Sequence, residues 1–171
     1  MLEVYPIGRP DLPPALDLGA VMVAIDRIET LPNALRATLD GCGDLDHPIR
    51  DGAWPIRTVV HHLADSHMNA FLRTKRALTE EAPLVESVDV DAWAATADVR
   101  APVEASLDLI AALHLRWVEL LRSASPADLE RPWHVRADPE PRATWRLALL
   151  YAWHGDHHAA QIRQAREHYG L

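Results

Sequence analysis

The placement of proline most constrains how this chain of 171 residues can fold. Thirteen prolines occur, and all except Pro32 fall in the segments 6–14, 48–55, 83–102 and 126–141. Because proline suits loops and first helical turns but disrupts helix interiors, these segments mark connections. The stretches between them are rich in Ala, Leu, Arg and Glu and follow the hydrophobic period of helices.

The sequence therefore predicts an all-α fold, a four-helix bundle that forms one domain over residues 1–171. The predicted helices cover 17–39, 55–79, 102–124 and 144–168. Pro32 should kink or split the first helix. Strand signals are weak, and only a short hairpin near 133–142 is expected before the last helix. The connection 80–101 is long enough to run along the bundle and leave the second and third helices parallel, so the topology stays open.

Charge and composition exclude several classes of partner. The formal net charge is −8 and no long basic run exists, so nucleic acid and anionic membranes are not expected partners. No apolar stretch reaches the length of a transmembrane helix. A single cysteine, Cys42, excludes an intramolecular disulfide and fits a reducing cytoplasm. We therefore expect a cytoplasmic protein.

Two of the ten histidines lie one helical turn apart near the C-terminus. His154 and His158 share one face of the last predicted helix, because residues at i and i+4 lie one above the other. Both fall within the apolar stripe of that helix and should point into the core. Unpartnered buried polar groups are costly, and one transition-metal ion would be a partner for both imidazoles.

Other histidines are sorted by the same periodicity. His114 lies in the apolar stripe of the third helix and His67 in that of the second, whereas His61 points away. His62 lies at the edge of the second stripe, and His157 lies off the stripe of the last helix. From the residues alone, the third ligand of a metal stays open between His62, His67 and His114. His62 begins a polar seam along the second helix that continues through Ser66, Asn69 and Arg73.

Four segments, in order along almost the whole chain, resemble the YfiT group of the DinB-like superfamily. They are 5–8 (YPIG), 50–83 (which contains HHLADSHMN), 113–117 (LHLRW) and 151–162 (YAWHGDHHAAQI). The resemblance implies a four-helix bundle that holds one divalent transition metal, zinc or nickel, through three histidines. It also implies a homodimer.

Carried over position by position, the resemblance selects His62, His154 and His158 as the metal ligands. His67 and His114 then become the candidate catalytic residues, which would orient the substrate or a ligand of the metal. Arg73 would either meet a carboxylate of the cosubstrate or form a surface ion pair.

Three neutral imidazoles leave an open coordination position, which is typical of catalytic metal sites. The resemblance favours an S-transferase that joins a low-molecular-weight thiol, bacillithiol-like, to an electrophilic small-molecule substrate. The alternative is a metal-dependent hydrolase that uses activated water and a nearby histidine as general base. A non-enzymatic metal or ligand binder is the third hypothesis and would need a closed site, with His67 or Asp65 as an extra ligand.

Two residues beside the histidine pair have expected roles of their own. Gly155 lies inside the last helix, where glycine costs about 1 kcal/mol relative to alanine. We expect it to be tolerated variation, and the alternative is close approach of a substrate group to the backbone. The angle of Asp156 on the helix predicts that it points away from the core into solvent.

Overall fold

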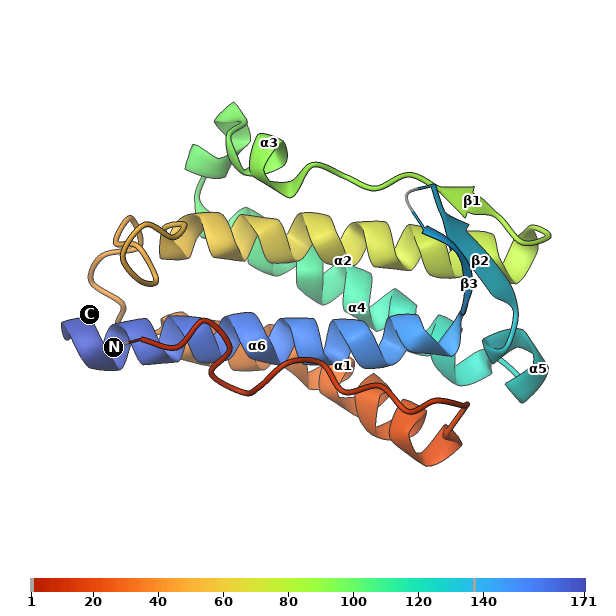
Figure 1. Ribbon diagram of the computed structural model, residues 1–171. Helices are drawn as coiled ribbons and strands as arrows, with labels where there is room; N and C mark the ends of the chain where they lie inside the picture. Colours follow the sequence, from red (N-terminus) through yellow and green to blue (C-terminus); the bar gives the residue numbers. More distant parts are fainter. Residues whose placement is uncertain (1, 137) are drawn as a thin grey trace.

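The computed structural model describes residues 2–136 and 138–171 and contains the predicted four-helix bundle (Figure 1). Its long helices are α1 (Leu18–Leu39), α2 (Ile56–Thr79), α4 (Val103–Ser123) and α6 (Trp145–Tyr169). The shorter helical elements are α3 (Val90–Ala94), η1 (Ala97–Arg100) and α5 (Pro126–Leu129). Each end of the four long helices lies within about one residue of its predicted position, because proline and capping residues set these limits.

The helix ends show how the sequence sets these limits. The Asp17 carboxylate accepts a hydrogen bond from the backbone N–H of Ala20 and caps α1. Pro55 and Pro102 directly precede α2 and α4. Gly170 ends α6 in the left-handed conformation, with φ of 70°, which glycine adopts without steric cost.

Helix α1 continues through Pro32, so of the two predicted alternatives the proline does not split the helix. Pro32 is buried within a continuous helix, and its neighbours Leu31 and Leu35 pack in the core. Tertiary packing thus outweighs the loss of one backbone hydrogen bond at the proline.

The bundle has two pairs of parallel helices. Figure 1 shows α2 and α4 running in one direction while α1 and α6 run in the other. The parallel pair α2 and α4 requires the connection between them to return along the bundle. This connection carries β1, α3 and η1 and runs back beside α2, where it covers the polar seam.

A small sheet lies at the end of α2. The predicted hairpin is present as β2 (Pro132–Val135) and β3 (Asp138–Ala143), which pair antiparallel. The strand β1 (Leu84–Val85) was not predicted and pairs in parallel with β2, with Leu84 opposite His134. The sheet thus fixes the start of the long connection to the segment before α6.

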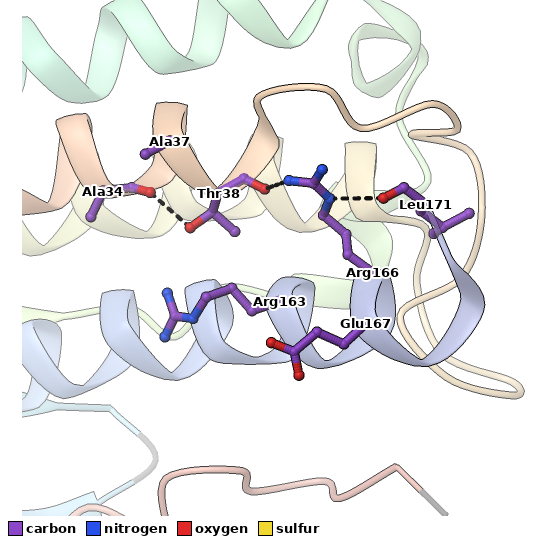
Figure 2. A pocket seen from close by; sticks show the side chains of 7 residues that line it. All are labelled: Ala34, Ala37, Thr38, Arg163, Arg166, Glu167 and Leu171. Atoms are coloured by element: carbon purple, nitrogen blue, oxygen red, sulfur yellow. Dashed lines mark hydrogen bonds between the residues drawn. The ribbon is translucent and has the colours of Figure 1, made fainter.

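The opposite end of the bundle is closed by Arg166 of α6. Its guanidinium donates to the backbone carbonyl groups of Thr38, Asp40 and Leu171. Figure 2 shows the hydrogen bonds of Arg166 to Thr38 and Leu171, beside a cavity of about 600 Å³ that Arg163 also lines. No histidine lines this cavity, so the candidate site lies elsewhere in the bundle. Across residues 2–136 and 138–171, no helix has the length and apolar character needed to cross a bilayer.

Candidate metal centre

Three partly buried histidines from two helices converge in the bundle. The ring nitrogens that His62, His154 and His158 can offer as ligands lie within 4.8 Å of one another. His62 comes from α2, and the other two lie one turn apart on α6. The structure therefore brings together the three side chains that the family resemblance selects. No other group of three or more potential metal-ligating side chains occurs among the described residues.

Behind His154, a line of hydrogen bonds crosses the core. His154 Nδ1 lies 3.3 Å from Nε2 of His67, and His67 Nδ1 lies 2.8 Å from Nε2 of His114. The line ends where His114 Nδ1 lies 2.6 Å from the carbonyl oxygen of Ile28. His67 and His114 are fully buried. We call the imidazoles of His154, His67 and His114 the histidine relay.

The end of the relay sets the tautomer of each ring. The Ile28 carbonyl can only accept, so His114 donates from Nδ1 and accepts at Nε2. His67 must then donate from Nδ1 to His114 and accept at Nε2 from His154 Nδ1. The Nε2 lone pair of His154 is therefore left facing His62 and His158. Orientation of a ligating histidine through its second nitrogen is a general feature of metal sites.

Pro32 explains why the Ile28 carbonyl is free to accept. In a regular helix this carbonyl would bond the N–H of the residue four positions later. That residue is Pro32, which has no N–H. The carbonyl left without its helical partner is the one that His114 bonds, so the proline in α1 supports the site from the far side of the core.

His158 is oriented through a different route. Its Nδ1 lies 2.8 Å from Oε1 of Gln161, whose Nε2 donates at 2.8 Å to the backbone carbonyl of Val4. The carbonyl fixes the orientation of the amide, so His158 donates from Nδ1 and presents Nε2 to the site. The N-terminal segment thus holds a candidate ligand through one glutamine.

Burial keeps these imidazoles neutral. It lowers the pKa of His62 to about 4 and that of His158 to about 3. The pKa of His114 is also lowered to about 4, and burial moves the pKa values of His67 and His154 well below their usual range. Neutral imidazoles have free lone pairs at pH 7, which metal binding requires.

The donor set fits a divalent transition metal. His62 Nε2 and His154 Nε2 are 3.2 Å apart, a gap bridged either by a proton on His62 or by a cation. Two nitrogens about 2.0–2.1 Å from a tetrahedral zinc ion would be separated by roughly 3.3 Å. Three neutral nitrogen donors, two of them with fixed tautomers, suit zinc, nickel and related ions.

Two cavities lie near the three histidines, and His158 lines one of them directly. One of about 290 Å³ is lined by His158, Gln161, Trp54, Arg50 and Asp91. The other, of about 540 Å³, extends along the polar seam of α2 toward the small sheet. A gap of about 20 Å³ beside His62 shares four lining residues with this second cavity: Ser66, Asn69, Val88 and Val90. The partly exposed edges of the histidines thus lie next to space for small molecules.

Two histidines that the periodicity placed off the apolar stripes are nevertheless buried. His61 is buried, with Nδ1 2.7 Å from Ser106 Oγ and Nε2 3.1 Å from the Ala101 carbonyl. The returning connection and α4 cover that face of α2. His157 is also buried, because the N-terminal segment places Tyr5 over it and Trp153 stacks on its ring.

The expectation for Gly155 is wrong, whereas Asp156 points away from the core as predicted and keeps 37% of its side chain exposed. A Cβ at Gly155 would lie 2.2 Å from Cδ2 of Leu31, so this glycine allows α1 and α6 to approach closely. The space beside it belongs to Leu31 and not to a substrate. Asp156 accepts a hydrogen bond from Nε of Arg27 at 2.6 Å, so it ties α6 to α1.

Comparison with known proteins identifies the family. The profile of the DinB superfamily matches residues 27–162, which include all five histidines of the site. The chain belongs to the DinB superfamily. The sequence resemblance that predicted this membership and the four-helix bundle is therefore confirmed.

Relatives are similar over almost their whole length. A Geobacillus thermodenitrificans protein named "Putative metal-dependent hydrolase" is 44% identical over 169 residues, which cover 97% of this chain and 95% of that protein. A Bacillus cereus protein of the same name is 40% identical over 168 residues, 95% of each. The solved structure of Bacillus subtilis YfiT, described as "a probable metal-dependent hydrolase with an unusual four-helix bundle topology", superposes with a TM-score of 0.93 at 35% identity. That match covers 98% of both chains.

Sequence reasoning missed the groups that hold the histidines in place. Gln161 and the Ile28 carbonyl were not predicted as partners of the site. Pro32 is the only sequence signal for the role of the Ile28 carbonyl, since a proline inside a helix frees the carbonyl four residues before it. Nothing local in the sequence indicates that His114 lies opposite that carbonyl, because the contact depends on how α1 and α4 pack.

Proposed function

We propose that this protein is a metal-dependent S-transferase that joins a low-molecular-weight thiol to an electrophilic small molecule. The observation that carries the proposal is the convergence of three neutral imidazole nitrogens near two cavities, one lined by His158 and the other connected to His62 by the small gap beside it. A transferase needs room for two substrates on either side of one reactive centre. A hydrolase needs room for only one substrate, because its second reactant is water.

The residues present would hold one divalent ion, zinc or nickel, through Nε2 of His62, His154 and His158. Such an ion keeps its full charge and lowers the pKa of a thiol or water at its open position. The chain supplies the fixed geometry, through the relay behind His154 and through Gln161 behind His158. Because these contacts exist before substrate arrives, little reorganisation is needed during the reaction.

The relay also bears on which nucleophile the site favours. His67 and His114 lie on the far side of His154, and each has both ring nitrogens engaged within the core. Neither is in a position to take a proton from water at the open side. A thiolate attacks carbon without a separate general base: a C–S bond forms, the leaving group departs with its electron pair, and the thiol proton has already passed to solvent.

A hydrolase is the second candidate, supported by the names of the relatives and by Asp65. Asp65 lies one turn from His62 on α2 and lines the same small gap. Burial raises the pKa of this carboxyl group. That is the direction expected of a carboxylate that serves as general base near neutral pH.

Product analysis separates the two reactions. Zinc-loaded protein is incubated with bacillithiol or cysteine and with an electrophile such as 1-chloro-2,4-dinitrobenzene, and products are resolved by mass spectrometry. The transferase gives a conjugate that retains the sulfur, well above the uncatalysed rate, and His154→Ala loses this rate. A product that contains oxygen from labelled water and no sulfur would instead establish hydrolysis.

A further inference from the structure

The cavity along the polar seam contains an arginine that no acidic side chain neutralises. The guanidinium of Arg73 forms no ion pair among residues 2–136 and 138–171. It makes two long hydrogen bonds of 3.3 Å, one to Tyr151 Oη and one to the backbone carbonyl of Glu86. Both acceptors are neutral, so most of its hydrogen-bonding capacity is unused. Of the two roles predicted for Arg73, the surface ion pair is therefore absent among the described residues.

The other charges on the cavity wall cancel each other. Asp138 and Arg142 both line it and are paired at 2.7 Å. The nearby carboxylate of Glu86 is paired with Arg136. The cavity therefore has one uncompensated positive charge, at Arg73. The cavity beside His158 contains a second arginine, Arg50, which forms no ion pair with the described residues although Asp91 lines the same cavity.

Tyr151 provides a second donor at the same place. Its hydroxyl oxygen accepts from Arg73, which leaves the hydroxyl proton free to donate. The ring is buried and packs edge-on against His154, at a centroid distance of 5.6 Å. Tyr151 thus contacts Arg73 with its hydroxyl group and the candidate ligand His154 with its ring.

From these observations we infer that Arg73 and Tyr151 form a subsite for a carboxylate of the small molecule whose other end reaches His62, His154 and His158. A single uncompensated charge suits a monoanion, and the planar fork of a guanidinium matches a carboxylate. The inference deepens the proposed function, on which it rests, because it identifies the thiol substrate as one that bears a carboxylate.

The spacing along α2 limits the size of this substrate. His62 and Arg73 are eleven positions apart in the sequence, which places their Cα atoms roughly 16 Å apart on a helix. Both side chains lean toward the N-terminus of the helix, and the side chain of Arg73 is the longer, so the span between the guanidinium and the imidazole is shorter than that between the Cα atoms. The cavity of about 540 Å³ and the gap beside His62 supply the path.

A chain-length series of thiols tests the subsite on the cobalt-loaded protein. The ω-mercaptoalkanoates from 3-mercaptopropionate to 8-mercaptooctanoate are compared with ω-mercaptoalkanols of equal length, and binding is followed by thiolate-to-cobalt absorption. In the wild type, the longer carboxylates bind about tenfold more tightly than the matching alcohols, because one charge-assisted hydrogen-bond pair is gained. In Arg73→Gln that ratio falls to about one while the alcohols bind unchanged.

Arg163→Gln is the matched control. It removes the same charge from the exposed arginine beside the cavity in Figure 2, at the end of the bundle closed by Arg166. The carboxylate preference should persist in this variant. A preference absent from the wild type, or retained in Arg73→Gln, overturns the inference, and the melting temperature of each variant verifies that it is folded.

Octanoate separates failure of the subsite from failure of the proposed function. If no thiol changes the cobalt spectrum, the proposed thiol chemistry fails, and calorimetric binding of octanoate then decides the subsite by itself. Binding that Arg73→Gln abolishes supports the subsite without the thiol. The inference is overturned if octanoate does not bind, or if it binds equally well to the wild type and to Arg73→Gln.

Discussion

The histidine relay and the polar seam of α2 contain similar polar side chains but use their donors differently. In the relay, each ring nitrogen of His67 and His114 has a partner, and the line ends on a carbonyl freed by Pro32. In the seam, Arg73 makes only long bonds to neutral acceptors and faces a cavity. The comparison teaches that the buried side fixes the geometry of the candidate ligands, whereas the open side keeps donors available for a small molecule.

The largest expected effect comes from cutting the relay. His114→Leu removes the partners of His67 Nδ1 and of the Ile28 carbonyl, and both stay buried. Two unsatisfied buried groups should lower the free energy of unfolding by about 3 kcal/mol. Urea denaturation of the metal-free protein measures this. The control His168→Leu changes an exposed histidine and should stay within about 0.5 kcal/mol; equal effects of the two variants would show that the relay contributes no stability.

A smaller effect is expected from the contact behind His158. Gln161→Leu removes the acceptor of His158 Nδ1, so the affinity for zinc should fall about 10- to 100-fold. Competition with a zinc chelator gives the affinity. Gln164→Leu is the matched control, since Gln164 lies on the same helix and makes no side-chain hydrogen bond with the described part of the chain. Unchanged zinc affinity in Gln161→Leu would show that Gln161 does not orient His158 for metal binding.

The relay should also make stability depend on pH. Burial lowers the pKa of His114 to about 4, whereas an unfolded histidine has its usual value near 6.5. As the pH falls below about 6.5, the unfolded chain binds the proton first, so this contribution to stability is complete above that pH and is lost toward pH 4. The slope is about 1.4 kcal/mol per pH unit for each such group. Denaturation of the metal-free protein at several pH values should therefore give a shallower slope for His114→Leu than for the wild type.

The smallest effect is expected in the seam. Ser66 is partly exposed and its hydroxyl makes no hydrogen bond within the described residues, so Ser66→Ala should change the free energy of unfolding by no more than about 0.5 kcal/mol. Thermal denaturation measures the change. A decrease in the free energy of unfolding as large as that of His114→Leu would show that the seam and the relay contribute equally to stability.

The sequence predicted the helices of this protein better than the contacts between them. Helix limits followed from Pro55, Pro102, Asp17 and Gly170, because these residues act locally. Periodicity placed His67 and His114 inside, and the family resemblance selected His62 over them as the third member of the cluster. The burial of His61 and His157 was missed because it depends on the returning connection and on the N-terminal segment, which have no helical period.

The same distinction applies to Gly155. Its role follows from the approach of Leu31 on a helix more than a hundred residues away in sequence. Local propensity gives only the cost of a helical glycine and not the reason for it. The role of Gly155 is therefore determined by packing between distant helices, which the local sequence pattern does not predict.

The measurement that tests this account most directly is the metal content of the untagged protein and of His154→Ala. Elemental analysis should find about one equivalent of a divalent transition metal in the wild type and almost none in the variant, because loss of one of three imidazoles opens the site. The variant His168→Ala should keep the metal. Wild-type protein that binds no zinc or nickel even when the ion is supplied would contradict the account and leave the inward histidines as a hydrogen-bonded core network.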